Sequence, residues 1–140
     1  MLETKELEKI IKSRILSVFP DFDFELEQIN FGLGPNNYPG TIFIYTQDDK
    51  YQYISIGDRG KQTHKEFTSE DDVLYAILNS FIFRMALDYE KEHREPGKDF
   101  RRIYFAKQIE LYSKFGKEFE ERKIAQINEI LRKAPYHDEE

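Results

Sequence analysis

The apolar residues of this chain change their spacing twice, and this change restricts the fold more than any other feature of the sequence. Across residues 3–19 they recur three and four positions apart, as in a helix that buries one face. Across residues 22–67 they alternate with polar residues in short runs, as in half-buried strands. The helical spacing returns from residue 69 onward. The sequence therefore predicts an α+β fold with an N-terminal helix, a small antiparallel sheet of three or four strands, and three C-terminal helices packed on one sheet face.

The sheet is predicted from four short runs that are separated by turn residues. The runs are residues 22–29, 41–46, 51–57 and, as a short edge strand, 62–67. Residues 47–50 form a short connection between the second and third runs, so these two runs are expected to form an antiparallel hairpin. Glycine, proline and asparagine crowd together in residues 32–40, which predicts a long turn.

The three C-terminal helices are expected at residues 69–93, 100–115 and 117–133. The first is apolar on nearly every side across residues 73–87, which is typical of a buried helix. Arg84 lies in this stretch, and a buried arginine needs a partner, which Asp88 one turn later can supply. Pro135 is expected to end the last helix, and residues 137–140 are expected to fray after it.

The length of 140 residues fits one domain, so we expect residues 1–140 to form a single domain. The chain has no cysteine, which excludes disulfides and thiolate chemistry. It has no apolar run of the length that a signal peptide or a membrane-spanning helix needs, so we expect a cytoplasmic protein that does not contact a membrane. The formal net charge of −6 disfavours nucleic acid as a partner and suits a basic protein, although the same charge can serve only solubility.

The search for catalytic, metal-binding and cofactor-binding motifs finds none that is complete. Glu90 and His93 have the Glu-x-x-His spacing of a di-iron helix, but the sequence lacks the second such pair that this site requires. The glycine-containing segments 32–34 and 57–61 lack the spacing of a phosphate-binding loop. We therefore expect a protein that is not an enzyme and that holds no metal and no cofactor.

Charged and polar residues cluster around the helix break near Pro96. The members of this polar cluster are Arg84, Asp88, Tyr89, Glu90, His93, Arg94, Asp99, Arg101 and Arg102. We expect a structural network of ion pairs that locks two helices around a corner, because such networks are common without catalysis. The alternative is a small enzyme that acts on an anionic substrate. That alternative would use Glu90, Arg94, Arg101 and Arg102.

Tyrosines and aspartates in and near the predicted sheet are the best candidates for contact with a protein partner. They are Tyr38, Tyr45, Asp48, Asp49, Tyr51 and Tyr53, with Asp71 and Asp72 behind them. Tyrosine supplies a large contact area at a low entropy cost, which suits an interface. Cross-strand packing explains the same tyrosines equally well. A structural adaptor domain that assembles through its sheet face is a further alternative.

The sequence from Tyr53 to Asp138 resembles the immunity protein 63 family of bacterial polymorphic toxin systems. The residues that carry the resemblance are Tyr53, Ile54, Ser55, Arg59 and Gly60, then Asp88, Tyr89, Glu90, His93, Arg94, Gly97, residues 99–102, Phe105, Gln108 and Leu111, and finally residues 130–131 and 134–138. Phe119 departs from the pattern, because the family is expected to have tryptophan there.

This resemblance implies a protein that is made beside a toxin and neutralises it. The mechanism would be tight, stoichiometric binding that covers the active site of the toxin or blocks its substrate. The partner would be a cognate protein toxin, and an acidic surface would suit a nuclease with a basic cleft.

Overall fold

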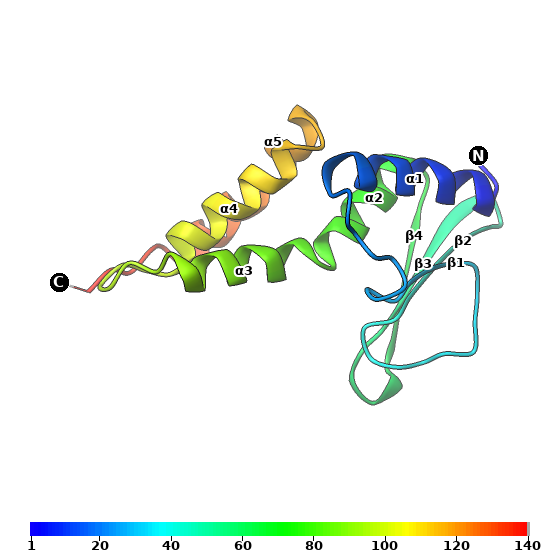
Figure 1. Cartoon of the computed structure of the whole chain (residues 1–140), viewed down its shortest axis with the longest axis horizontal. Coiled ribbons are helices and arrows are strands. Elements are labelled where there is room, and N and C mark those ends of the chain that lie inside the picture. Colours follow the sequence, from blue (N-terminus) through cyan, green and yellow to red (C-terminus); the bar gives the residue numbers. More distant parts are fainter. Residues whose placement is uncertain (140) are drawn as a thin grey trace. The chain divides into compact units, whose positions relative to one another are not determined.

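The computed structural model describes residues 1–139, which form two compact units (Figure 1). One unit spans residues 1–77, and the other begins at Leu78. The elements are α1 (Thr4–Val18), β1 (Ile29–Phe31), β2 (Ile42–Gln47), β3 (Lys50–Ile56), a 3-10 turn (Asp58–Gly60), β4 (Gln62–Phe67), α2 (Glu70–Asn79), α3 (Ile82–Glu92), α4 (Arg101–Ser113) and α5 (Lys117–Lys133). This order of helix, strands and helices confirms the α+β class. Because two compact units can still fold together, the single-domain expectation stays a prediction.

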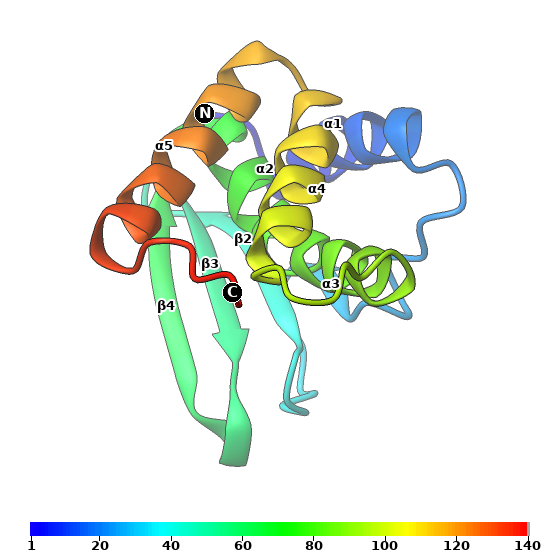
Figure 2. The same cartoon turned by 90° about the vertical axis from the view of Figure 1, so that its left-hand side faces the viewer.

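The sheet lies in the first unit and has the strand order β1-β2-β3-β4. β2 and β3 form the predicted antiparallel hairpin, and β4 pairs antiparallel with β3, as Figure 2 shows. β1 instead pairs with β2 in parallel, with Ile29 opposite Ile42. The sheet is therefore mixed, and the prediction of a purely antiparallel sheet is wrong. The reason is the long turn at residues 32–40, which returns the chain to the end of the sheet where β1 started.

Residues 22–28 do not form the strand that their alternation predicted. Asp23 causes the difference, because its side-chain oxygen accepts hydrogen bonds from the backbone N–H groups of Glu25 and Leu26, both at 3.0 Å. Such bonds favour a turn over an extended strand. The alternating Phe22 and Phe24 pack edge to face on each other, with ring centres 4.7 Å apart.

The structure also divides the predicted helix at residues 69–93 into α2 and α3. The break falls at Ser80 and Phe81, directly after Asn79. Asparagine and serine are poor helix formers, because their side chains compete for backbone hydrogen bonds. The apolar spacing continues across the break and therefore concealed it. Four helices, α2 to α5, replace the three that were expected within residues 69–133.

Two helices pack on one face of the sheet within the first unit. The predicted apolar stripe of α1 is confirmed for Leu7, Ile11 and Ile15, which are fully buried, whereas Ile10, which the prediction included, is 41% exposed and Val18 is half-buried. The hydroxyl of Thr46 in β2 donates to the carbonyl oxygen of Leu2 at 2.7 Å, just before α1. Tyr53 in β3 donates its hydroxyl hydrogen to the carbonyl oxygen of Ala76 in α2 at 3.3 Å. Thr46 and Tyr53 share one face because side chains alternate along strands. We call this the covered face and its reverse the open face.

The hairpin turn between β2 and β3 consists of Asp48 and Asp49, whose φ angles are 57° and 58°. Two successive left-handed residues define a type I′ turn, for which Asn-Gly is the preferred sequence. We expect the double variant Asp48→Asn with Asp49→Gly to raise the free energy of unfolding by about 1 kcal/mol. Urea denaturation measures this change. A double alanine variant should instead lower stability, and equal stability of both variants would contradict the turn geometry.

Candidate functional site

The polar cluster predicted around the helix break divides into separate ion pairs within the second unit. Arg94 grips Glu90 with two hydrogen bonds, from Nε at 3.1 Å and from a terminal nitrogen at 2.7 Å. The Glu90 side chain is only 1% exposed, whereas that of Arg94 is 60% exposed. Hydrogen bonds from Arg94 lower the pKa of Glu90, so this carboxyl stays charged despite its burial. This pair lies at the end of α3, and its two charges pair with each other.

Asp99 and Arg101 form the second pair, which also holds the C-terminal tail. The Asp99 carboxylate accepts hydrogen bonds from Arg101 at 2.7 Å and from the backbone N–H of His137 at 2.9 Å. Arg101 donates in addition to the carbonyl oxygens of Ala134 and Pro135, both at 2.8 Å. One guanidinium thus connects the start of α4 with the residues that follow α5.

Arg102 and Asp138 complete this attachment of the tail. The ion pair between their side chains measures 2.9 Å, and Asp138 also accepts the backbone N–H of Asp99 at 2.7 Å. The Arg102 guanidinium lies 4.3 Å from the centre of the Tyr136 ring, a cation–π contact. We call Asp99, Arg101, Arg102, Tyr136 and Asp138 the tail clasp.

The prediction that the tail frays is wrong for the residues that the structure describes. Glu139 also donates its backbone N–H to the carbonyl oxygen of Gly97 at 2.8 Å. Glu140, which the prediction included, lies outside the described residues. An acidic tail was expected to stay in water, but here Asp138 accepts hydrogen bonds from the Arg102 side chain and from the backbone N–H of Asp99, more than thirty residues earlier in the sequence.

The remaining members of the polar cluster lie on α3. Arg84 is exposed, with its guanidinium 5.8 Å from the ring centre of Phe83, so the expectation of a buried arginine is wrong. The cause is that α3 buries Ile82, Ala86 and Glu90, which recur four residues apart on one side of the helix, and Arg84 lies off this side. Tyr89 and His93 stack with ring centres 3.9 Å apart. Asp88 is exposed on the same helix.

The contribution of the tail clasp to the stability of the fold depends on pH through its two aspartates. Hydrogen bonds from Arg101 hold the pKa of Asp99 well below its usual range, and those from Arg102 lower the pKa of Asp138. Each carboxyl therefore binds a proton more readily in the unfolded chain than in the folded one. The clasp accordingly stabilises the fold above about pH 4, and this contribution is lost as the pH falls through the folded-state pKa values.

We expect Asp138→Asn to loosen the tail without unfolding the second unit. The variant removes the charge that pairs with Arg102, so the tail should open more often. Amide hydrogen exchange at Asp99, whose N–H is bonded to Asp138, should become about tenfold faster. Glu139→Gln is the control, because it removes the same charge from the next residue. Equal exchange rates in the two variants would show that the clasp does not hold the tail.

A buried lysine that sequence reasoning missed lies elsewhere in the second unit. Lys123 of α5 is 8% exposed, and its ammonium nitrogen lies 3.2 Å from the side-chain oxygen of Asn79. The Tyr112 hydroxyl donates to the same oxygen, and the Tyr112 ring centre is 4.6 Å from the ammonium nitrogen. Burial lowers the pKa of Lys123 to about 8, with a further decrease from the charge of Arg122. A lysine in a charged helix has no sequence signal that reveals this burial.

The stability of the protein should therefore rise between pH 8 and pH 10 because of Lys123. In this range the folded protein has lost the lysine proton, whereas the unfolded chain still binds it, so unfolding takes up a proton. We expect the stability of the wild type relative to Lys123→Met to increase by up to about 1.4 kcal/mol per pH unit. Urea denaturation at several pH values measures the difference. A constant difference would contradict the lowered pKa.

The structure separates the residues that were predicted to contact a partner. Tyr51 and Tyr53 are 1% and 7% exposed, because they lie on the covered face beneath the helices. The expectation that they present surface to a partner is therefore corrected. Tyr38 is 69% exposed, and Tyr45 is half-buried on the open face. Tyr38 lies just before the start of β2, since the carbonyl oxygen of Tyr38 accepts the N–H of Thr41.

The predicted aspartates lie on two elements of the first unit. Asp48 and Asp49 are exposed at the β2–β3 turn. Asp71 is exposed in the first turn of α2 and pairs with Arg14 of α1 at 2.5 Å. Asp72 is half-buried, and its backbone N–H donates to the Ser69 hydroxyl at 3.1 Å. Whether any of them touches a partner stays a prediction.

The buried Tyr51 brings several acidic residues together at one end of the sheet. Its hydroxyl oxygen accepts the N–H of Leu2 at 3.1 Å, which fixes the start of α1 beside β3. Burial raises the pKa of Tyr51, and the carboxylates of Glu70 and Glu6 raise it further. The acidic end, as we call it, comprises Glu3, Glu6, Asp48, Asp49 and Glu70. Acidic side chains at the starts of α1 and α2 also interact favourably with the helix dipoles.

The net charge of the chain comes entirely from the first unit. Residues 1–77 contain 14 acidic and 8 basic side chains, whereas residues 78–140 contain 13 of each. The formal charge of −6 therefore belongs to the unit that carries the sheet and the acidic end. A basic partner would be attracted to this unit in preference to the other.

The open face carries a polar network that the sequence search did not find. Gln52 is 5% exposed, and its amide nitrogen donates to the carbonyl oxygen of Gln47 at 2.9 Å and to Glu66 at 3.2 Å. Its amide oxygen therefore accepts from Nε2 of His64 at 2.6 Å. Tyr45 lies directly opposite Gln52. Strand alternation places these side chains on one face, but only the register between strands shows that they meet.

Two further features are absent from the described residues. Within residues 1–139, no group of three histidine, aspartate or glutamate side chains is arranged to hold a metal ion. No helix in this range is both long enough and apolar enough to cross a membrane.

Comparison with known protein families gives a match to the model of Immunity protein 63, which covers residues 48–129. The match extends from the β2–β3 turn into α5, and it confirms the resemblance that the motifs indicated. It includes Asp99, Arg101 and Arg102 of the tail clasp, whereas Tyr136 and Asp138 follow its last residue. Comparison with curated proteins and with solved structures gives no match.

Proposed function

The chain belongs to the Immunity protein 63 family, and on this basis we propose that it neutralises one cognate toxin by stoichiometric binding, without catalysis of its own. A toxin partner is what membership of an immunity protein family implies in general. The binding mode and the part of the chain that makes the contact are the further content of the proposal.

The observation that supports this proposal most strongly is the segregation of charge between the two units. The first unit carries the whole net charge of −6, while acidic and basic residues balance in the second. Within the second unit, the predicted cluster is occupied by its own ion pairs, such as Arg94 with Glu90 and Arg102 with Asp138. We therefore place the contact with the toxin on the first unit.

The proposed contact residues are the accessible ones among those predicted from the sequence. They are Tyr38, Tyr45, Asp48, Asp49, Asp71 and Asp72. Tyr51 and Tyr53 are not among the contact residues. Their buried side chains hold in place the strands that carry the surface residues. A toxin that fits this surface would be basic where it binds, as a nuclease with a cationic cleft is.

The enzyme alternative would need the four charged residues of the cluster to be open to an anionic substrate. The Arg101 guanidinium instead donates hydrogen bonds to Asp99 and to two backbone carbonyls. Glu90 is buried beneath Arg94. These contacts favour the structural role for the cluster. They support the binding proposal because they leave the first unit as the surface with unbalanced charge.

The proposal is tested with the toxin encoded beside this chain, carrying a substitution that abolishes its activity. We expect isothermal titration calorimetry to show one toxin bound per chain. The double variant Asp48→Asn with Asp49→Asn should lower the association rate constant by about threefold to tenfold at low salt, because two attractive charges are lost. Asparagine tolerates the left-handed turn, so the fold should be retained.

The matched control is Glu92→Gln with Glu95→Gln, which removes two exposed charges from the second unit. This control should leave the association rate within a factor of about two. Absence of binding by the wild type would refute the proposal itself. Equal effects of the two double variants would keep the immunity function but remove the first unit as the contact surface.

A further inference from the structure

The first strand of the sheet has a free edge with unused backbone groups. In the parallel pairing of β1 with β2, Ile42 donates to the carbonyl oxygen of Gln28 at 2.9 Å, and Gly32 donates to that of Ile44 at 2.7 Å. This register turns the N–H and C=O of Asn30 toward β2. The backbone groups of its neighbours in β1 consequently point away from the sheet.

Most of these outward groups have no partner within residues 1–139. The N–H of Ile29 donates to the carbonyl oxygen of Phe24 at 2.9 Å. The carbonyl of Ile29 and both backbone groups of Phe31 make no hydrogen bond in the described part of the chain. They present one donor flanked by two acceptors, the arrangement that an additional strand requires.

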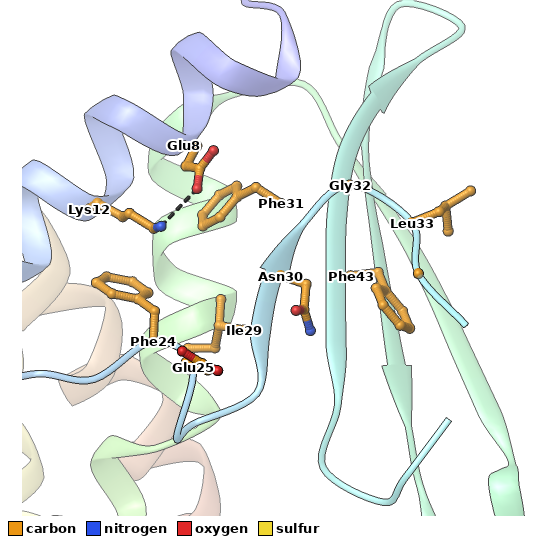
Figure 3. A pocket seen from close by; sticks show the side chains of 11 residues that line it. Glu8, Lys12, Phe24, Glu25, Ile29, Asn30, Phe31, Gly32, Leu33 and Phe43 are labelled. Atoms are coloured by element: carbon orange, nitrogen blue, oxygen red, sulfur yellow. Dashed lines mark ion pairs between the residues drawn. The ribbon is translucent and has the colours of Figure 1, made fainter. Parts of the chain in front are cut away.

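A pocket of about 320 Å³ runs along this edge. Figure 3 shows Phe24, Ile29 and Phe31 on the side of β1 nearer to α1, and Asn30 and Phe43 on the other side. The pocket therefore extends around the free edge of β1 to both faces of the strand and is not confined to one face. A bound strand would place alternate side chains on both sides in the same manner, whereas a small molecule is usually enclosed.

The charged side chains that line the pocket are Glu8, Lys12 and Glu25. The Lys12 ammonium lies 5.3 Å from the centre of the Phe24 ring and 5.9 Å from that of the Phe31 ring. Lys12, which lines the pocket, is paired with Glu8 at 2.7 Å, a contact that Figure 3 marks with a dashed line. Glu25 lines the pocket and is exposed. The lining therefore has a formal net charge of −1, from Glu25, and it belongs to the unit that carries the whole net charge of −6, so it favours a basic occupant over an acidic one.

The opposite edge of the sheet is less suited to strand addition. β4 exposes His64, Lys65 and Glu66, and charged side chains on an edge strand discourage pairing with another chain. β1 has only Ile29, Asn30 and Phe31, none of which is charged. The two edges therefore differ in the property that governs strand addition.

We infer that an extended, basic segment of the partner toxin adds to the edge of β1 as a fifth strand and inserts alternate side chains into the pocket. This inference rests on the proposed function, because it takes the toxin as the occupant. Backbone hydrogen bonds to Phe31 and Ile29 hold the segment, and a lysine or arginine side chain of the segment pairs with Glu25.

Phe31→Pro is the decisive variant, compared with Phe31→Ala. Both variants lose the ring, but only proline loses the N–H, and that N–H does not serve the sheet. We expect Phe31→Pro to raise the dissociation constant for the inactivated toxin about tenfold above that of Phe31→Ala. Gln62→Pro, at the first position of β4, is the control and should bind as the wild type does. Circular dichroism establishes that each variant is folded.

Amide hydrogen exchange on the wild type gives a second measurement that needs no variant. The N–H of Phe31 should exchange quickly in the free protein and at least tenfold more slowly in the toxin complex. If the toxin binds but this amide stays unprotected and the two Phe31 variants bind equally, strand addition is refuted while the immunity function stands. If the wild type does not bind the toxin, both proposals fail. Self-association by light scattering that Phe31→Pro abolishes would identify a second copy as the occupant and overturn the inference.

Discussion

Two adjacent arginines attach the C-terminal tail to the start of α4 in the second unit. The roles that we propose for the two units depend on this attachment. Arg101 and Arg102 bind a tail segment that lies more than thirty residues later in the chain. An arginine cannot shed its charge, so each of them needs carboxylate or carbonyl partners when it packs against other groups. Asp99 and Asp138 meet this need from within the same unit. The charged residues that the enzyme alternative would have used are therefore part of the ion pairs that stabilise the second unit.

With these charges paired within the second unit, the unbalanced charge of the molecule lies in its first unit. That unit combines a net charge of −6 with a sheet whose open face is the reverse of the face that α1 and α2 cover, and whose first strand has unused backbone groups at its edge. Opposite charge mainly speeds the encounter between two proteins, while hydrogen bonds and packing determine how long they stay together. In the binding mode that we propose, the acidic end speeds the encounter with the toxin, and the edge of β1 prolongs the complex.

The sequence predicted what short-range patterns determine. The stripe of Leu7, Ile11 and Ile15, the β2–β3 hairpin and the family membership all follow from residues close together in the chain. The parallel pairing of β1, the burial of Lys123 and the tail clasp each depend on residues that are far apart in sequence, and no local pattern encodes such pairings. Tyr51 shows the same limit within the candidate site. Alternation placed it in a strand, but only the position of α1 shows that its side of the sheet is covered.

The tail clasp also sets an order in which the parts of the chain can mature during synthesis. At a translation rate of about 5 to 20 residues per second, Arg102 leaves the ribosome about 2 to 7 seconds before Asp138 does. The first unit, whose contacts end at residue 77, is complete in the nascent chain well before that moment. The residues of the acidic surface are therefore all synthesised while the second unit still lacks its closing contact.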